Sequence, residues 1–443
     1  MSKSYHIETY GCQMNVADSE LVSAMLQKAG YQETGNIEKA DAIFVNTCAI
    51  REHAEDKVHS RLGFYNKIKE KKPSTIIGVL GCMAQNLKEN ILESKPYVDI
   101  VLGPDSYRKL PEMLNDRTAK SSHIVDTKLS RYEVYDNLFP SRAEGVNAWV
   151  SIMRGCDKFC TFCIVPFTRG RERSRSIDSI KNEVLLAVDN GFSEITLLGQ
   201  NVNSYDYEGK KFHELLKEIA QIKNVKRIRY TSPHPKDMTL DVLSVMSSYD
   251  NICNYVHLPL QAGNNNVLRR MNRTYTKEEF IKLSNVIRDK LPGVGISTDI
   301  IVGFPGENEK EFYETLDVMN EVVFDSAFTF KYSSRPGTKA AEYDDHVPEK
   351  EKQRRLESVI QLQSEHTLIR NKKFINKVEL VLVEKESKRS VNQWAGRTDS
   401  NKWVIFNKKS EKIGDIVPVY ITSAHGITLQ GKIQKIQEME LVS

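Results

Sequence analysis

The sequence predicts an α/β protein in three parts: a flavodoxin-like doubly wound domain, a partial barrel of six β/α units, and a small OB-like β-barrel. Three observations support this fold class. Short apolar strands alternate with helical patterns from His6 to Thr127, the alternation resumes with a different rhythm from Ala148, and five short strands divided by polar turns begin at Val378. Alternating strands and helices are typical of parallel sheets, and closely spaced short strands are typical of small barrels.

Length and composition agree with this division. The chain has 443 residues, which corresponds to about three domains at roughly 150 residues each. Hydrophobic residues make up 40% and charged residues 28%, enough apolar mass for several cores. No apolar run approaches the roughly 18 residues of a membrane span, and Met1–His6 does not open a signal peptide, so we expect a cytoplasmic protein with reduced thiols. The net charge of +4 permits a polyanionic partner without requiring one.

The first part, residues 1–127, has the pattern of a doubly wound domain. Five strands are expected, the last of them weaker, at His6–Gly11, Ala42–Cys48, Thr75–Cys82, Val98–Gly103 and His123–Thr127. Helical patterns lie between them at Ala17–Gly30, Arg51–Lys72, Leu87–Ser94 and Tyr107–Leu114. Five parallel strands with helices on both faces suit the flavodoxin-like version of this fold.

Three cysteines of this domain, the N-terminal trio, occupy equivalent positions. Cys12 follows the first strand, and Cys48 and Cys82 end the second and third. Because the carboxyl ends of parallel strands meet at one edge of the sheet, the three thiols should form a site with one ligand missing. A glycine before Cys12 and before Cys82 lets the backbone approach a bulky cluster closely. The alternatives are three small buried residues and, with less support, a Cys–His catalytic pair, for which only His53 and His59 lie near.

Residues 128–145 are polar and irregular, and we interpret them as a linker to the second part, residues 146–373. Six strands are expected there, at Ala148–Met153, Glu194–Leu198, Arg227–Thr231, Tyr255–Pro259, Gly295–Val302 and Ser326–Lys331. Helical patterns accompany them at Ser179–Asn190, His213–Gln221, Leu240–Ser248, Lys277–Leu291, Glu309–Val322 and Glu349–Arg370. Six units are too few for a closed barrel of eight, so an open barrel with an accessible side is predicted.

The loop Gly155–Cys163 follows the first barrel strand and carries three cysteines, the barrel trio. Cys156, Cys160 and Cys163 have the spacing C-x3-C-x2-C, so their thiolates can bind one iron–sulfur cluster and leave one position open for chemistry. A zinc site would need a second, distant pair, a ferredoxin-type carrier a fourth nearby cysteine, and a disulfide framework an oxidising compartment. The open cluster is favoured over these three. Cys253 stands apart from both trios and is predicted to lie in the core.

The spacing of the barrel trio resembles the signature of the radical S-adenosylmethionine (SAM) enzymes, whose usual fold is a six-unit open barrel. In that family the amino and carboxylate groups of SAM bind the uncovered iron of a [4Fe–4S] cluster. SAM also needs hydrogen bonds to its ribose, adenine and amino acid head. Gln200, Gln261 and Asp299, which follow or end barrel strands, are candidate partners, and Phe162 is placed to cover the adenine. Each could instead serve loop polarity or loop packing.

The third part, residues 374–443, has five expected strands, at Val378–Glu384, Gln393–Arg397, Trp403–Phe406, Ile416–Thr422 and Thr428–Gln434. OB-like barrels bind looped or single-stranded nucleic acid with aromatic and basic side chains. Such side chains are present at Lys388, Arg389, Arg397, Lys402, Trp403, Lys408 and Lys409. The alternative is a solvated surface on an accessory domain.

Four arginines alternate just after the loop of the barrel trio, at Arg169, Arg171, Arg173 and Arg175. Guanidinium groups at the mouth of the barrel could hold the phosphates of a nucleic acid and fix its position. The equally plain interpretation is a solvated basic stretch.

Over nearly its whole length the chain resembles the methylthiotransferases of the radical SAM class. These proteins combine an N-terminal three-cysteine domain, a C-x3-C-x2-C barrel and a C-terminal RNA-binding TRAM domain. Separate groups modify isopentenyl-adenosine beside the tRNA anticodon, threonylcarbamoyl-adenosine at the same place, or an aspartate of a ribosomal protein. Asn46–Arg51 and Arg227–Pro235 resemble the isopentenyl-adenosine group, with Pro233 where a Ser is expected. All three groups carry a TRAM domain, so that domain does not discriminate between them.

The resemblance implies a mechanism and a set of partners. The cluster on the barrel trio would pass an electron to SAM, and the resulting 5′-deoxyadenosyl radical would remove hydrogen from C2 of the adenine, a bond that side-chain acid–base chemistry cannot activate. A second cluster, expected to be [4Fe–4S], on the N-terminal trio would carry sulfur that a different SAM molecule methylates. We expect a monomer that binds a tRNA anticodon stem-loop, an electron donor such as flavodoxin or ferredoxin, and a sulfur source. The alternative from another class is an iron–sulfur RNA-binding regulator or electron carrier without chemistry of its own.

Overall fold

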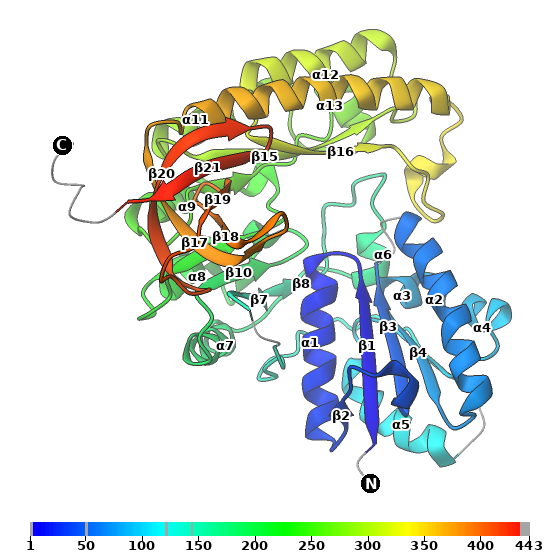
Figure 1. Ribbon diagram of the computed structural model, residues 1–443. Helices are drawn as coiled ribbons and strands as arrows, with labels where there is room; N and C mark the ends of the chain where they lie inside the picture. Colours follow the sequence, from blue (N-terminus) through cyan, green and yellow to red (C-terminus); the bar gives the residue numbers. More distant parts are fainter. Residues whose placement is uncertain (1–2, 49–51, 120–122, 143–144, 435–443) are drawn as a thin grey trace.

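A computed structural model describes residues 3–48, 52–119, 123–142 and 145–434 of the chain. It confirms the predicted α/β fold class with its C-terminal β-barrel. In Figure 1 the N-terminal domain, blue to cyan, lies beside the central domain near β7 and β8, and the C-terminal barrel, orange to red, packs on the central domain. No helix among the described residues is long and apolar enough to cross a membrane.

The N-terminal domain is built on a parallel sheet of order β2-β1-β3-β4-β5-β6. The five expected strands are present as β1 (Ser4–Tyr10), β3 (Ala42–Thr47), β4 (Ile76–Gly81), β5 (Ile100–Leu102) and β6 (Ile124–Asp126). The sixth, β2 (Gln32–Glu33), was not predicted, because two exposed residues carry no periodic pattern. With β2 beside β1, the sheet has the flavodoxin-like order plus one edge strand, and the order reverses between β1 and β3.

Helices cover both faces of this sheet. They are α1 (Gln13–Lys28), α2 (Glu52–Lys71), α3 (Cys82–Leu87), α4 (Asn90–Ser94) and α5 (Leu110–Ala119), with the 3-10 turns η1 (Ile37–Lys39) and η2 (Tyr107–Lys109). Helix α1 starts at Gln13, earlier than the predicted Ala17, and α3 is an additional helix before α4, which matches the predicted Leu87–Ser94. The Asn15 side chain accepts the backbone N–H of Cys12, which starts α1 before its apolar periodicity begins.

The central domain has the six predicted strands, arranged as two parallel sheets of three. One holds β7 (Asn147–Ser151), β10 (Glu194–Leu198) and β13 (Arg227–Tyr230), and the other β14 (Tyr255–His257), β15 (Gly295–Val302) and β16 (Ser326–Lys331). A bridge between Ile228 and Ile252 joins them into the predicted partial barrel. The outer layer consists of α7 (Ile177–Asp189), α8 (Phe212–Ala220), α9 (Leu240–Ser248), α10 (Asn265–Arg270), α11 (Lys277–Lys290), α12 (Glu309–Val322) and α13 (Glu349–Lys372).

Smaller elements decorate this barrel. They are β8 (Met153–Arg154), α6 (Val165–Arg169), β9 (Arg173–Ser174), the hairpin of β11 (Asp206–Tyr207) and β12 (Lys210–Lys211), and the turns η3 (Val202–Ser204), η4 (Pro235–Asp237) and η5 (Lys339–Glu342). Strands β8 and β9 pair antiparallel and flank the loop of the barrel trio. That loop is therefore held at both ends.

Residues 127–142 have no regular secondary structure but are packed between the first two domains. Tyr135 is buried, stacks on Tyr107 with ring centroids 5.9 Å apart, and donates its hydroxyl to the carbonyl of Pro104 at 2.8 Å. Nearby, Met14 and Ala17 of α1 form an apolar cluster with Leu198 at the end of β10. The N-terminal domain is thus docked tightly against the first sheet of the barrel.

The C-terminal domain is a closed barrel of order β17-β18-β19-β21-β20, which matches the five expected strands. Their bounds are β17 (Val378–Ser387), β18 (Ser390–Arg397), β19 (Trp403–Asn407), β20 (Ile416–His425) and β21 (Thr428–Ile433). Arg229 on β13 donates to the carbonyls of Thr398 and Asp399 at 2.8 and 2.9 Å. This barrel therefore docks near the amino ends of the central strands, away from the cysteine loop.

Candidate functional site

The barrel trio lies on a loop whose backbone geometry demands glycine at its start. Gly155 has φ +80°, and a Cβ there would lie 2.0 Å from the carbonyl oxygen of Arg171. Its N–H donates to Oε1 of Gln200 at 2.5 Å. Gln200, a candidate SAM partner by sequence, thus ties the end of β10 to the residue before Cys156.

Contacts from distant segments hold the rest of this loop. The backbone N–H of Thr161 donates to the carbonyl of Met271, and its carbonyl accepts from Ala340. Arg273 donates through Nη1 to Sγ of Cys160 at 3.3 Å. The sequence analysis missed Arg273, because no motif marks an arginine that reaches a thiol 113 residues away.

Burial makes two thiols of the barrel trio harder to deprotonate. It raises the pKa of Cys156 to about 11 and the pKa of Cys163 to about 12. The neighbouring Cys160 thiol raises both pKa values further, as expected for thiols on one short loop. Such thiols become thiolates when a metal cation binds them.

The N-terminal trio converges at the carboxyl edge of the parallel sheet. Cys12 precedes α1, Cys48 follows β3, and Cys82 is the first residue of α3. A hydrogen bond with Cys48, opposed by burial and aided by the Arg169 guanidinium, lowers the pKa of Cys12 to about 6. Burial raises the pKa of Cys82.

Two buried asparagines that the sequence analysis did not assign brace this edge. Asn15 accepts the Cys12 N–H at 3.3 Å and donates to Oδ1 of Asn46 at 3.2 Å. Asn46 in turn donates to the Asn15 carbonyl at 3.0 Å. A Cβ at Gly11 would lie 2.8 Å from Cβ of Cys48, so glycine is required where these loops meet. The sequence could have indicated Asn15 and Asn46 only through their positions close to Cys12 and Cys48.

Contacts across the domain interface join the segments that carry the two trios. Cys82 packs against Ile164, the residue after Cys163. Arg169, at the end of α6, donates through Nε to Sγ of Cys82 at 3.2 Å. The two predicted cysteine sites are therefore neighbours in one structure.

This contact corrects the RNA-binding role expected for Arg169. Its side chain is 3% exposed and pairs with Asp18 at 2.8 Å. Arg173 and Arg175 are also buried, in ion pairs with Asp105 and Glu183. Alternation on an irregular segment does not fix which side chains face water. Carboxylates of the N-terminal domain pair with Arg169 and Arg173, and Glu183 of α7 pairs with Arg175. Arg171 remains exposed and pairs with Asp157 at 2.6 Å.

The other candidate SAM residues lie in the cysteine loop (Phe162), within β15 (Asp299) and beside β15 through a bridge to Ile300 (Gln261). Gln261 adopts φ +70°, and its Oε1 is buried with no hydrogen-bond partner among the described residues. Asp299 accepts from Nε2 of His257 at 3.3 Å. Phe162 meets Phe304 edge-on, with ring centroids 6.5 Å apart.

The C-terminal candidates for RNA contact divide into two kinds. Arg397 and Lys402 are corrected to docking residues: Arg397 pairs with Glu194 at 2.8 Å, and buried Lys402 pairs with Asp325 at 2.7 Å. The physical reason is that their segment packs on the amino ends of the central strands. Trp403 is half-buried, and the exposed Lys385 lies 4.5 Å above its ring.

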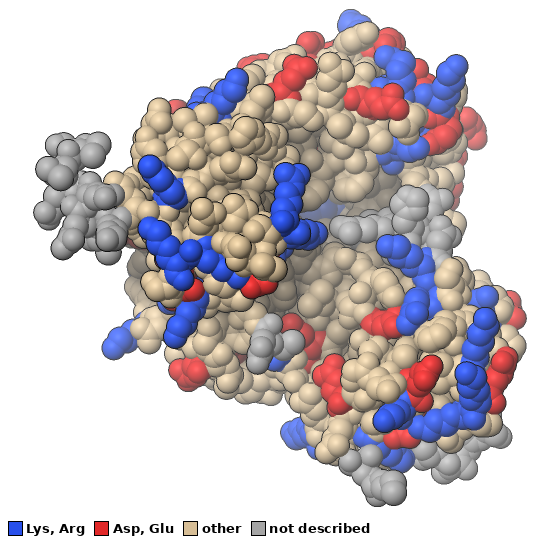
Figure 2. All heavy atoms as spheres, viewed as in Figure 1, with Lys and Arg blue, Asp and Glu red and all other residues tan. Residues whose placement is uncertain are grey.

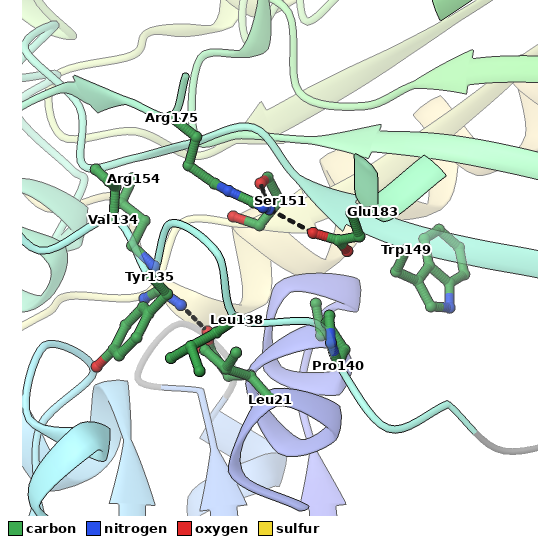
Figure 3. A pocket seen from close by; sticks show the side chains of 12 residues that line it. Leu21, Val134, Tyr135, Leu138, Pro140, Trp149, Ser151, Arg154, Arg175 and Glu183 are labelled. Carbon is green, nitrogen blue, oxygen red and sulfur yellow. Dashed lines mark hydrogen bonds and ion pairs between the residues drawn. The ribbon is translucent and has the colours of Figure 1, made fainter. Parts of the chain in front are cut away.

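Each trio offers three thiols as donors. Within the described part of the chain, no three His, Cys, Asp or Glu side chains are arranged to hold one metal ion. Three thiols match a cubane cluster that keeps one iron open. Figure 3 shows a separate pocket, where Tyr135 and Arg154 approach Leu21 at the domain interface, and none of the cysteines lines it.

Family models match each of the three domains. The model described as uncharacterized protein family UPF0004 matches residues 4–103, the Radical SAM superfamily matches residues 150–319, and the TRAM domain matches residues 372–433. The fold and the cysteine loop thus define a radical SAM protein with a TRAM domain. Membership of this superfamily implies a [4Fe–4S] cluster and SAM as cofactors.

Curated relatives show to which family within this superfamily the chain belongs. The chain is 48% identical over 433 residues to the tRNA-2-methylthio-N(6)-dimethylallyladenosine synthase of Parabacteroides distasonis, covering 96% of this chain and 94% of the relative. It is 47% identical over 441 residues to the protein of that name from Porphyromonas gingivalis, covering 97% and 95%. The chain belongs to the tRNA-2-methylthio-N(6)-dimethylallyladenosine synthase family.

Solved structures support the fold at greater distance. The radical SAM methyltransferase TsrM from Kitasatospora setae has a TM-score of 0.58 at 12% identity, covering 77% of this chain and 75% of that chain. The cobalamin-dependent SAM radical enzyme OxsB has a TM-score of 0.55 at 14% identity, covering 72% and 52%. At these identities the likeness concerns the fold alone.

Proposed function

We propose that the protein transfers a methylthio group to C2 of N(6)-dimethylallyladenosine in the anticodon stem-loop of tRNA. A [4Fe–4S] cluster and SAM would occupy the site of the barrel trio, and a second cluster the N-terminal trio, with two SAM molecules used per turnover. The observation that supports this proposal best is the contact of Cys82, in the N-terminal trio, with Ile164, the residue after Cys163 of the barrel trio. A radical site and a sulfur site must both reach one adenine ring, and this arrangement allows it.

The residues of the chain would bind and orient these groups. When bound, the cluster and SAM supply hydrogen-atom abstraction from an unactivated C–H bond. Gln200 fixes Gly155 and the loop after it, and Arg273 holds Cys160. We assign SAM binding to Gln261, whose buried Oε1 needs a donor, and to Asp299, with Phe162 near the adenine. The packing of α1 against Leu198 would keep water out on one side.

An apolar face inside the barrel favours the dimethylallyl substrate. Phe328 and Phe330 lie on the same face of β16 and are 57% and 44% exposed. The Phe328 ring meets His257 edge-on at 5.9 Å, and His257 contacts Asp299, so this face adjoins the proposed SAM site. Two uncovered phenyl rings suit a branched hydrocarbon. A threonylcarbamoyl group carries a carboxylate and would need a cation there instead.

Basic side chains outside the barrel suit a tRNA partner. Figure 2 shows Lys and Arg side chains on the C-terminal barrel and at the edge of the hollow between the domains. Lys385 and Lys408 lie over the rings of Trp403 and Trp394, at 4.5 and 4.1 Å. Such pairs can bind phosphate and stack bases. A flavodoxin or ferredoxin as electron donor, a sulfur source, a monomeric state and a cytoplasmic location complete the proposal.

The test is mass spectrometry of tRNA nucleosides after reaction with the anaerobically reconstituted protein, SAM and a reductant. We expect a methylthio product from isopentenylated tRNA and none from unmodified tRNA. A product from threonylcarbamoylated tRNA would redirect the substrate assignment. The alternative of an iron–sulfur RNA-binding regulator would be supported if the reduced protein formed no 5′-deoxyadenosine from SAM.

A further inference from the structure

Two buried arginines flank the loop that carries the barrel trio, and both meet one carboxylate. Arg154 lies just before Gly155, and Arg169 ends α6 just after the loop. Their side chains are each 3% exposed, and both pair with Asp18 of α1. Asp18 of the N-terminal domain therefore holds both ends of a barrel loop.

Only one of these two arginines reaches a thiol. Arg169 uses Nη2 for Asp18 and Nε for Sγ of Cys82, at 2.8 and 3.2 Å. Its third donor, Nη1, is buried and has no hydrogen-bond partner among the described residues. The terminal nitrogens of Arg154 bind Asp18 and the Pro104 carbonyl, and its buried Nε has no partner in the described part of the chain. Among the described residues no hydrogen bond joins Arg154 to sulfur. An unsatisfied charged donor in a buried site costs free energy unless an acceptor binds there.

The charges buried around Arg169 also favour an anion bound next to it. Two buried carboxylates, Asp18 and Asp105, face three buried guanidinium groups, those of Arg154, Arg169 and Arg173. Counted over these carboxylates and guanidinium groups alone, the excess is one positive charge, and Arg169 is the guanidinium group that contacts Cys82. A buried cation of this kind is stabilised by an anion in contact with it. Thiolates that hold a cluster, and the cluster's own sulfide, are such anions.

We propose that Arg169 is a positioning residue of the N-terminal site. Its Nε fixes Cys82, and its free Nη1 donates to a sulfur atom of the group that the N-terminal trio binds, while Asp18 orients the guanidinium. This inference rests on the proposed function, since it requires that the trio hold an iron–sulfur cluster. It also gives the barrel loop a direct part in the sulfur site.

The experiment uses the full chain in a background where Cys156, Cys160 and Cys163 are replaced by Ala, so that only the N-terminal trio can hold iron. Protein is reconstituted anaerobically with iron and sulfide. Iron per chain, the rate of iron loss to a chelator and the electron paramagnetic resonance spectrum of the reduced protein are then measured. Arg169→Met is compared with Arg154→Met, which loses the same carboxylate partner but no contact with sulfur.

We expect Arg169→Met to lose iron about tenfold faster than the background, with a changed spectrum, because the partners of cluster ligands typically contribute this much. Arg154→Met should stay close to the background in both readouts. Equal iron loss and equal spectra in the two variants would overturn the inference. If the background itself binds no iron, the proposed cluster of the N-terminal trio is wrong, and the inference falls with it.

A second substitution covers the case in which Arg169→Met does not fold. Arg169→Lys keeps the charge, but one ammonium group cannot replace the planar fork that contacts Asp18 and Cys82 together. It should lose iron clearly faster than Arg154→Met. Iron loss at the background rate would show that charge alone suffices and would overturn the two-donor role.

Discussion

The backbone N–H of Gly155 donates to Oε1 of Gln200 at 2.5 Å, so the end of β10 sets the position of the loop that carries the barrel trio. Gln200→Leu removes the acceptor and leaves a buried N–H unpaired, at a cost of about 1–3 kcal/mol. We expect SAM cleavage to fall about tenfold, in line with other partners of cluster ligands. The release of 5′-deoxyadenosine measures it. Gln221→Leu, at an exposed glutamine, should cleave SAM at the normal rate.

Replacing Cys82 should abolish methylthio transfer without abolishing SAM cleavage. Cys82→Ala removes one proposed ligand of the N-terminal trio while the barrel trio stays intact, so methylthio product should disappear while SAM cleavage persists. Both are measured in one reaction, by nucleoside mass spectrometry and by 5′-deoxyadenosine release. Cys253→Ala is the matched control, since Cys253 is also buried but is predicted to be a core residue. It should lower stability by about 1 kcal/mol and leave both activities. Retention of methylthio transfer by Cys82→Ala would contradict the sulfur-site role.

Most of the fold could be predicted because its elements have strong periodicity. The six central strands and the five C-terminal strands are apolar or alternating runs bounded by turns, which local pattern identifies. Strand β2 was missed because its pairing with β1 depends on tertiary contact and not on its two residues. The start of α3 at Cys82 was missed because its residues continue an apolar strand pattern.

The sequence predicted the cysteines of the candidate site but not the contacts between domains that surround them. The barrel trio is compact in sequence, and the N-terminal trio follows from parallel strand order. Asp18 and Arg169 are 151 residues apart, and no sequence motif predicts that they form an ion pair. A basic residue after a loop suggested a solvated or RNA-binding surface, whereas domain docking buried it. Burial at an interface between domains is a property of the whole chain, and local pattern does not encode it.

Glu20 should make stability depend on pH. Burial raises its pKa to about 7, with nearby Arg142 opposing the shift. Between its usual pKa near 4.5 and 7, the folded state therefore binds more proton than the unfolded state, and the free energy of unfolding falls as pH rises through this window. The loss is about 3 kcal/mol. Glu20→Gln should flatten this slope, as measured by Tm between pH 5 and pH 8. Glu93→Gln, at an exposed position, should keep the parental profile.

Substitution of two lysines of the C-terminal barrel should affect different properties: one substitution should weaken tRNA binding, and the other should lower stability. Lys385 is exposed above the Trp403 ring, whereas Lys402 is buried against Asp325. Lys385→Ala should weaken tRNA binding and reduce its salt dependence by about one phosphate contact, with Tm unchanged. Lys402→Met should lower stability by about 3 kcal/mol, because it removes one partner of a buried ion pair. Filter binding at several salt concentrations and thermal melting measure the two effects. A salt slope unchanged by Lys385→Ala would show that RNA does not contact this face, since only exposed cations can exchange counterions for phosphate.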